Sequence, residues 1–346
     1  MGDKTGISWT DATWGPVRGC SRISPGCQAC YAERIAARFS DPGMPYHGFA
    51  RRVPKTVGAS QPRWTGVVQL VPEHLADPIK WRKPRRIFVS SMSDVFHEKL
   101  SNEAIAVIFG VMAACPQHTF QVLTKRAARV REWFAWLATE AMSCNAGVGM
   151  TPAARCFVEA QRREPMNHGR KLLARGQIVD AALSAVWPLS NVWLGTSVEN
   201  QDAGDERLPE LASTPAAVRF VSCEPLLGPL SLVDFFADVA CRTGKTWIIA
   251  GCESGHGARP CEVDWLRSIR DQCGRAGVAF FLKQATQVDG AYTITDLRPV
   301  PQVLGRQGEL IPVVGVGAGS KEKGRSVIEL PYLDGVQWAQ FPEVSP

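Results

Sequence analysis

The sequence predicts an α/β fold, a full or partial (β/α) barrel with a helical insertion. Short apolar runs alternate along the chain with segments of helical periodicity, which is the pattern of parallel βαβ units. Six such runs occur without a glycine-rich dinucleotide-binding fingerprint, which favours a barrel over a doubly wound sheet. Polar side chains stand at the ends of these runs, where parallel barrels carry their chemistry.

The predicted strands are short and rich in β-branched and aromatic residues. They cover residues 85–91, 119–124, 191–198, 218–224, 246–251 and 279–283. Helices are expected between them. Ser101 should cap the helix after the first strand, and Asp264 should cap a helix that ends near Gly274 or Gly277.

The alternation of strands and helices breaks between residues 141 and 187. We therefore expect a barrel formed by residues 1–140 and 188–300, with a partly helical insertion at 141–187. Residues 301–346, rich in Gly, Pro and Val, should form a C-terminal tail that packs on the barrel.

Composition narrows the class of protein. Of the 346 residues, 45% are hydrophobic and 21% charged, which supports a sizeable core and argues against global disorder. The 11 cysteines are odd in number and mostly scattered, unlike a secreted disulfide framework. With no long apolar stretch, we expect a cytoplasmic protein without a membrane partner. The net charge of +6 suggests an anionic partner.

The segment GCSRISPGCQACYAERIAARF carries the strongest motif of the chain. Cys20, Cys27 and Cys30 have C-x6-C-x2-C spacing, and Pro25 and Gly26 supply a turn between the first two. Three thiolates on one loop suit a [4Fe–4S] cluster that keeps one iron without a protein ligand. The motif therefore predicts an iron–sulfur site with an open coordination position.

Two other interpretations of the motif remain. A structural zinc site usually has four ligands, so the fourth would have to come from a distant residue such as His47 or His97. Three unrelated buried cysteines are the second alternative, and this spacing makes it the weaker one.

Polar residues recur where the predicted strands end. They are Ser91, Ser93 and Asp94, then Lys125 and Arg126, then Ser197 and Glu199, then Glu224, Glu253 and Lys283. Ser and Asp also begin loops and cap helices, so a single position carries little weight. The repetition at consecutive strands, with Lys and Glu among the residues, favours a functional site.

The segment KWRKPRR at residues 80–86 places five cations around Trp81. Aromatic rings among cations suit the backbone and unstacked bases of nucleic acids. The alternative is a solvated basic surface whose tryptophan packs into the core.

The chain also resembles a family of phage and prophage proteins with a three-cysteine motif, known by phage gene-product numbers. That family is similar to a divergent branch of the radical S-adenosylmethionine (SAM) superfamily. The matching segments are WTDATWGPVRGC, SPGCQACYAER, FVSSMSDVFH, FQVLTKR, NVWLGTSVENQ, RFVSCEPLLGPL, GCESGHGARP, DWLRSIRDQC and GVAFFLKQ. Two positions depart from the family pattern: Cys252 stands where glycine is expected, and Ala285-Thr286 where Trp-Gly is expected.

The resemblance implies a barrel of the radical SAM type with a [4Fe–4S] cluster and SAM as cofactors. The expected cofactor-binding residues are Ser91, Ser93 and Asp94 for the SAM amino group, and Ser197 and Glu199 for its ribose. Glu224, Glu253 and Lys283 are then the expected catalytic residues, and Lys125, Arg126 and Arg259 the expected substrate-binding residues.

Two functions follow as expectations. The first is an enzyme that cleaves SAM reductively and acts on an unknown substrate, with a nucleic-acid base or nucleotide as one candidate. Its partner would be an electron donor such as a flavodoxin or ferredoxin. The second is a non-catalytic nucleic-acid-binding protein with a structural metal site.

Overall fold

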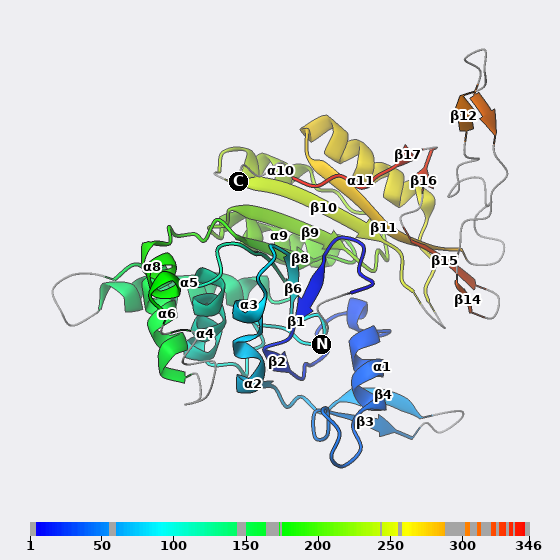
Figure 1. Cartoon of the computed structure of the whole chain (residues 1–346). Helices are drawn as coiled ribbons and strands as arrows, with labels where there is room; N and C mark the ends of the chain where they lie inside the picture. Colours follow the sequence, from blue (N-terminus) through cyan, green and yellow to red (C-terminus); the bar gives the residue numbers. More distant parts are fainter. Residues whose placement is uncertain are drawn as a thin grey trace. The chain divides into compact units, whose positions relative to one another are not determined.

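The computed structural model describes most of the chain (Figure 1). The described residues are 5–54, 60–143, 150–163, 173, 175–242, 244–254, 258–287 and short stretches between 302 and 342. The chain forms two compact units. Unit 1 comprises Met1–Thr196 and Arg207–Arg219, and unit 2 comprises Ser197–Glu206 and Phe220–Pro346.

Unit 1 is built on parallel strands. They are β1 (Ala12–Trp14), β6 (Arg86–Val89), β7 (Thr119–Thr124) and β8 (Val192–Ser197). β1 pairs with β6, β6 with β7 and β7 with β8, all in parallel register. The sequence predicted the last three of these strands. It did not predict β1, because three residues are too few to show a strand period.

Four helices of unit 1 pack against one another beside these strands (Figure 1). They are α4 (Asn102–Ala113), α5 (Ala127–Met142), α6 (Pro152–Arg163) and α8 (Gly176–Ser184). The expected cap of α4 is confirmed, since the Ser101 hydroxyl accepts a hydrogen bond from the Ala104 amide at 3.2 Å. A Cβ added at Gly110 would lie 2.3 Å from the carbonyl oxygen of Cys156, so α4 and α6 pack backbone to backbone. Within residues 141–187, α6 therefore belongs to the packed interior of unit 1.

The N-terminal part of unit 1 adds smaller elements (Figure 1). They are β2 (Val17–Arg18), the 3-10 helix η1 (Pro25–Cys27), α1 (Tyr31–Arg38), β3 (Ala50–Val53), β4 (Gln61–Trp64), β5 (Gln69–Leu70), α2 (Pro72–Leu75) and α3 (Asp77–Lys80). β3 and β4 form an antiparallel hairpin. Ala36 and Ala37 of α1 form a small core with Ala50 of β3, flanked by Tyr46 and Trp64.

Unit 2 continues the same alternation. Its strands are β9 (Val218–Cys223), β10 (Lys245–Gly251) and β11 (Ala279–Gln287), and its helices are α10 (Val233–Ala240) and α11 (Val263–Ala276), while α9 (Gln201–Ser213) contributes to both units. β10 and β11 pair in parallel. α11 ends as expected at Gly277, whose φ of 64° is left-handed. Its N-cap, however, is Glu262, and Asp264 lies in the first turn, where a negative charge favours the helix dipole.

The described stretches of the tail belong to unit 2, and some of them contact β10 and β11. They contain β12 (Gln302–Leu304), β13 (Leu310–Pro312), β14 (Ser320–Glu322), β15 (Arg325–Glu329), β16 (Tyr332–Leu333) and β17 (Val336–Gln337). β15 pairs antiparallel with β11. The amide of Leu282 donates to the carbonyl of Trp338 at 2.8 Å, and the Trp247 indole donates to the carbonyl of Gln340 at 2.8 Å.

Each unit thus alternates parallel strands with helices. This confirms the α/β class and is compatible with a partial (β/α) barrel. Among the described residues, no helix has the length and apolar character needed to cross a membrane.

Candidate functional site

The three motif cysteines lie on one loop that leads into α1. Their thiols are free and half-buried. Burial raises the pKa of Cys20 to about 12 and also raises the pKa of Cys30. The charge of Cys30 also contributes to the raised pKa of Cys20, and the charge of Cys27 to the raised pKa of Cys30. Three cysteine thiols are the type of ligand that binds an iron–sulfur cluster through three thiolates.

The thiols are not drawn together into a closed metal site. Across the described ranges, which include the whole cysteine loop, no three His, Cys, Asp or Glu side chains are grouped closely enough to hold a metal ion. Thiols must lose their protons to ligate a metal. Since burial favours the protonated form of Cys20 and Cys30, we expect proton release when a metal binds there.

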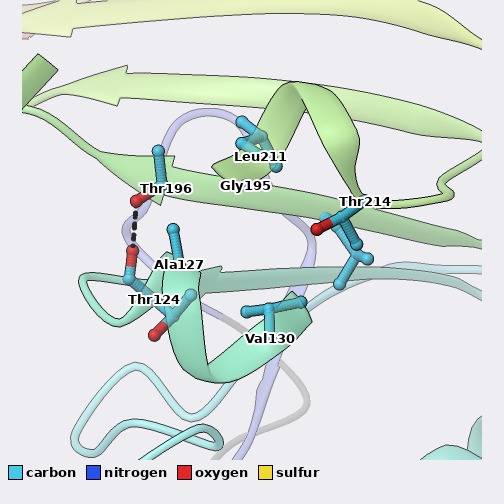
Figure 2. A pocket seen from close by; sticks show the side chains of 8 residues that line it. Thr124, Ala127, Val130, Gly195, Thr196, Leu211 and Thr214 are labelled. Atoms are coloured by element: carbon cyan, nitrogen blue, oxygen red, sulfur yellow. Dashed lines mark hydrogen bonds between the residues drawn. The ribbon is translucent and has the colours of Figure 1, made fainter. Parts of the chain in front are cut away.

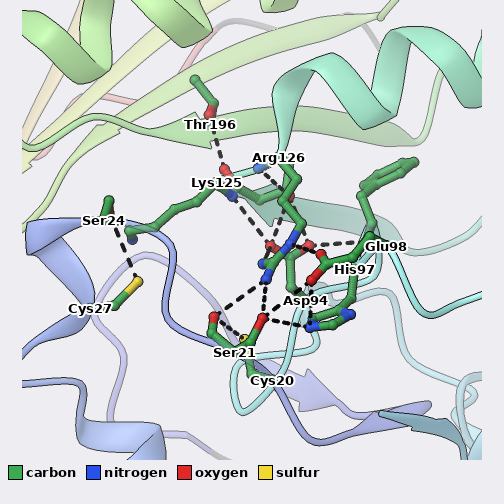
Figure 3. Close-up of polar contacts among 12 residues, drawn as sticks. Cys20, Ser21, Ser24, Cys27, Asp94, His97, Glu98, Lys125, Arg126 and Thr196 are labelled. Carbon is green, nitrogen blue, oxygen red and sulfur yellow. Dashed lines mark hydrogen bonds and ion pairs between the residues drawn. The ribbon is translucent and has the colours of Figure 1, made fainter. Parts of the chain in front are cut away.

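A buried ion pair joins this loop to the ends of two parallel strands (Figure 3). Arg126, two residues after β7, donates from Nη1 to Oδ2 of Asp94 at 2.9 Å. Its Nη2 donates to the hydroxyl of Ser21 at 2.9 Å, and its Nε to Oε2 of Glu98 at 2.7 Å. Ser21 directly follows Cys20 in the chain. Arg126 therefore fixes the start of the cysteine loop at the carboxyl ends of β6 and β7.

The carboxylate of Asp94 is fully occupied by protein partners. The Thr124 hydroxyl lies 2.7 and 2.9 Å from its two oxygens, and the Phe96 amide donates to Oδ1 at 2.9 Å. The Lys125 amide and Nη1 of Arg126 donate to Oδ2. A carboxylate has about four acceptor positions, so little capacity is left for a ligand. The structure therefore places Asp94 as an internal anchor, although the resemblance implied that it binds the amino group of SAM.

His97 completes the network under Ser21. Its Nε2 lies 2.8 Å from the Ser21 hydroxyl, and its Nδ1 accepts from the Lys99 amide at 3.2 Å. Burial lowers the pKa of the imidazole, which favours the neutral ring. Because both nitrogens have protein partners, His97 is poorly placed as the distant zinc ligand considered above. His47, the other candidate, is exposed and bonds to the carbonyl of Ser40.

The cations around the cysteine loop differ in their partners. Arg22 donates from Nε to the buried carboxylate of Glu33 at 2.9 Å, and Arg126 pairs with Asp94. Lys125 is half-buried and forms no ion pair with any residue that the structure describes. Its positive charge lowers the pKa of Cys30, which places the ammonium group near the loop (Figure 3). A ligand-binding role for Lys125 stays a prediction.

The predicted cofactor loop after β6 is held by its own contacts. The carbonyl of Ser91 accepts from the Tyr31 hydroxyl at 2.5 Å, and the Ser93 hydroxyl donates to the carbonyl of Val17 at 2.9 Å. Ser90, which no sequence pattern singles out, has a left-handed φ of 59° and is 3% exposed. Its hydroxyl has no hydrogen-bond partner among the described residues. Strained residues cluster at functional sites, so Ser90 joins the candidate residues.

Replacing Ser90 with glycine should raise the free energy of unfolding by about 1 kcal/mol, because glycine adopts a left-handed backbone without the Cβ clash. Ser93→Ala, two residues away, should instead lower it by about 1 kcal/mol through loss of a hydrogen bond. Urea denaturation followed by tryptophan fluorescence measures both. A Ser90→Gly variant less stable than the wild type would show that the backbone at Ser90 is not strained.

A small cavity lies between α5, α9 and strands β7 and β8 (Figure 2). It holds about 10 Å³, room for one water molecule. Its lining is mostly apolar apart from threonines, and the hydroxyl of Thr196 donates to the carbonyl of Thr124 at 2.9 Å. A cavity of this size is too small for SAM or a nucleotide, so it is not the candidate site.

Unit 2 brings other predicted residues together. Lys283 on β11 forms an ion pair with Glu224, which follows β9, at 3.0 Å. Glu224 Oε1 would lie 2.6 Å from a Cβ at Gly251, so the side chain rests against the glycine that ends β10. The Ser222 hydroxyl donates to Oε2 of Glu224 at 3.2 Å. The pair is therefore held in place from neighbouring strands.

A second ion pair follows β10. Glu253 Oε2 accepts from the Arg259 amide at 2.9 Å and from its Nε at 3.0 Å.

Ser197 and Glu199, expected to bind ribose, are 3% and 0% exposed. The amide of Leu227 donates to the carbonyl of Glu199 at 2.7 Å. The predicted site residues of unit 2 therefore form two ion pairs, and Ser197 and Glu199 lie buried at the end of a strand.

The fold and the site define an α/β protein with a three-cysteine loop anchored at the carboxyl ends of parallel strands. The chain belongs to the family described as protein of unknown function (DUF5131), whose model matches residues 4–342. No curated protein and no solved structure matches it.

Proposed function

We propose that the chain is a radical SAM-like iron–sulfur enzyme in which Cys20, Cys27 and Cys30 ligate one [4Fe–4S] cluster. The observation that carries the proposal is the anchoring of the cysteine loop by Arg126 and Asp94. This contact supports the proposal because it ties the cysteine loop to the strand ends, where parallel β/α proteins carry their chemistry. When bound, the cluster would supply the electron that cleaves SAM to methionine and a 5′-deoxyadenosyl radical.

The chain's own residues would position this chemistry. Arg126 and His97 hold Ser21, and therefore the backbone next to Cys20, in a fixed orientation. Partners of this kind orient metal ligands and tune the metal site. Lys125 would place a positive charge beside the loop, where it favours anionic groups.

Glu224, Lys283, Glu253 and Arg259 remain the proposed groups for substrate. Each of the two ion pairs contains one positive and one negative side chain. A polar substrate would bind by taking the place of one member of each pair. The net charge of +6 supports an anionic substrate, and a nucleic-acid base or nucleotide fits that class.

Anaerobically reconstituted and reduced protein should convert SAM to methionine and 5′-deoxyadenosine. Liquid chromatography with mass spectrometry measures both products. The matched control is Cys241→Ser, which changes an exposed free thiol outside the proposed site and should leave the cleavage of SAM within about twofold. A brown, iron-loaded protein that leaves SAM intact under reduction would exclude this activity.

The alternative is a non-catalytic nucleic-acid-binding protein with a structural metal site, favoured by the basic segment at residues 80–86. Two of its cations have internal contacts, since Arg86 pairs with Asp11 at 3.0 Å and Arg85 lies 5.2 Å from the centre of the Trp81 ring. Purified protein that is colourless, contains zinc and binds oligonucleotides would establish the alternative.

A further inference from the structure

The antiparallel hairpin of β3 and β4 has two unlike faces. Ala50 and Trp64 oppose each other in its register, and both pack on the alanine cluster of α1 (Figure 1). Successive residues of a strand point to opposite sides of the sheet. The next opposed pair, Arg51 and Arg63, therefore lies on the outer face of the hairpin, turned away from α1.

The two arginines of the outer face have no acidic partner among the residues that the structure describes. Arg63 donates to the side-chain oxygen of Gln61 at 2.8 Å and to the carbonyl of Pro62 at 2.9 Å, both on its own strand. Arg51 is exposed and directly opposes Arg63. Like charges that oppose each other across two strands are destabilising. An anion bound on this face would offset the repulsion between the two guanidinium groups.

The segment that contains the hairpin is basic throughout. Residues 42–72 contain four Lys and Arg and no Asp or Glu. Arg18 and Arg86, which lie on either side of this segment in the chain, are each paired with a carboxylate. Positive charge on the hairpin is therefore left uncompensated by the described part of the chain, and an anionic partner would complement it.

The composition of the outer face favours a nucleic acid as this partner. The described residues of β3 and β4 include no exposed large apolar side chain. A protein interface has an apolar centre, and a membrane-bound surface inserts apolar side chains into the lipid, so neither fits this face well. The backbone of a nucleic acid is a regular row of phosphates, which Lys and Arg neutralise with release of counterions.

One buried carboxylate joins the hairpin to the cysteine loop. Glu33 of α1 is 1% exposed, and its Oε1 accepts a hydrogen bond from the amide of Trp64 at 2.8 Å. Its Oε2 accepts from Nε of Arg22 at 2.9 Å, and Arg22 lies two residues after Cys20. Because Trp64 directly follows Arg63, the same side chain holds both the hairpin strand of the outer face and the cysteine loop.

We propose that the outer face of the β3–β4 hairpin, with Arg51 and Arg63 at its centre, binds the phosphate backbone of a nucleic acid. The inference rests on the proposed function for its purpose, which is to hold the polymer that carries the substrate base next to the cysteine loop. The binding itself needs neither a cluster nor SAM. Backbone contacts of this kind position a nucleic acid without reading its sequence.

The test measures the fluorescence anisotropy of labelled DNA and RNA oligonucleotides, single-stranded and duplex, titrated with the full chain without metal at several salt concentrations. Arg51→Ala combined with Arg63→Ala should weaken binding at least about tenfold at low salt. It should also reduce the slope of log affinity against log salt by about 1.5, because two phosphate contacts are lost. Arg51→Lys combined with Arg63→Lys keeps both charges and should bind within about threefold of the wild type.

Arg242→Ala combined with Arg275→Ala is the matched control, because it removes two exposed arginines of unit 2 and should bind like the wild type. Circular dichroism and melting curves verify that each variant folds. An unchanged affinity and salt slope in the alanine variant of the hairpin would overturn the proposal, as would their loss in an Arg82→Ala, Lys83→Ala variant instead. A wild-type chain that binds anionic lipid vesicles or polyglutamate but no oligonucleotide would overturn it as well. Failure of the reconstituted protein to cleave SAM would instead count against the proposed function, and the anisotropy would still decide the role of the hairpin.

Discussion

Replacing Asp94 with alanine should lower the free energy of unfolding by about 3–5 kcal/mol, among the largest effects of any single substitution in unit 1. The change leaves Arg126 without its main partner in a position where its side chain is only 8% exposed. The Thr124 hydroxyl and the Phe96 amide lose their acceptor as well. Urea denaturation of the protein without metal, followed by tryptophan fluorescence, measures the loss.

Two controls separate the buried charge from the lost hydrogen bonds. Thr124→Val removes one hydrogen bond and should cost about 1 kcal/mol. The double variant Asp94→Ala, Arg126→Met removes both charges and should be more stable than Asp94→Ala alone. If Asp94 served only to bind SAM, Asp94→Ala would be as stable as the wild type and would lose SAM affinity alone.

Much of the fold was predictable because it rests on local patterns. The apolar runs at residues 119–124 and 246–251 coincide with β7 and β10, since a strand buried on both faces has a continuous apolar sequence. Ser101 marked the start of α4 because its side chain caps the helix locally. β1 escaped prediction because its three residues gain their strand conformation from pairing with β6, a partner distant in the chain.

The candidate site was only partly predictable for the same reason. The spacing of the cysteines is local and visible, whereas the contact from Arg126 to Ser21 spans 105 residues and that to Asp94 spans 32. A sequence places Asp94 at a strand end but does not show that Thr124 and Arg126 occupy its carboxylate. The strain at Ser90 is equally invisible, because serine is not a residue typical of left-handed backbone.

Changing Cys20, Cys27 or Cys30 singly to alanine should abolish the visible absorption of the reconstituted protein and reduce its iron content to a small fraction of the wild-type value. A [4Fe–4S] cluster with an open iron needs all three protein thiolates, so the two thiolates left in each variant cannot hold it. Cys241→Ser is the matched control, since Cys241 is an exposed free thiol and should leave iron content unchanged. Iron analysis and absorption spectra after anaerobic reconstitution measure the outcome, and circular dichroism verifies folding. Full iron content in all three variants would show that the cluster is held elsewhere, and stoichiometric zinc in the wild type in place of iron would favour the structural-metal alternative.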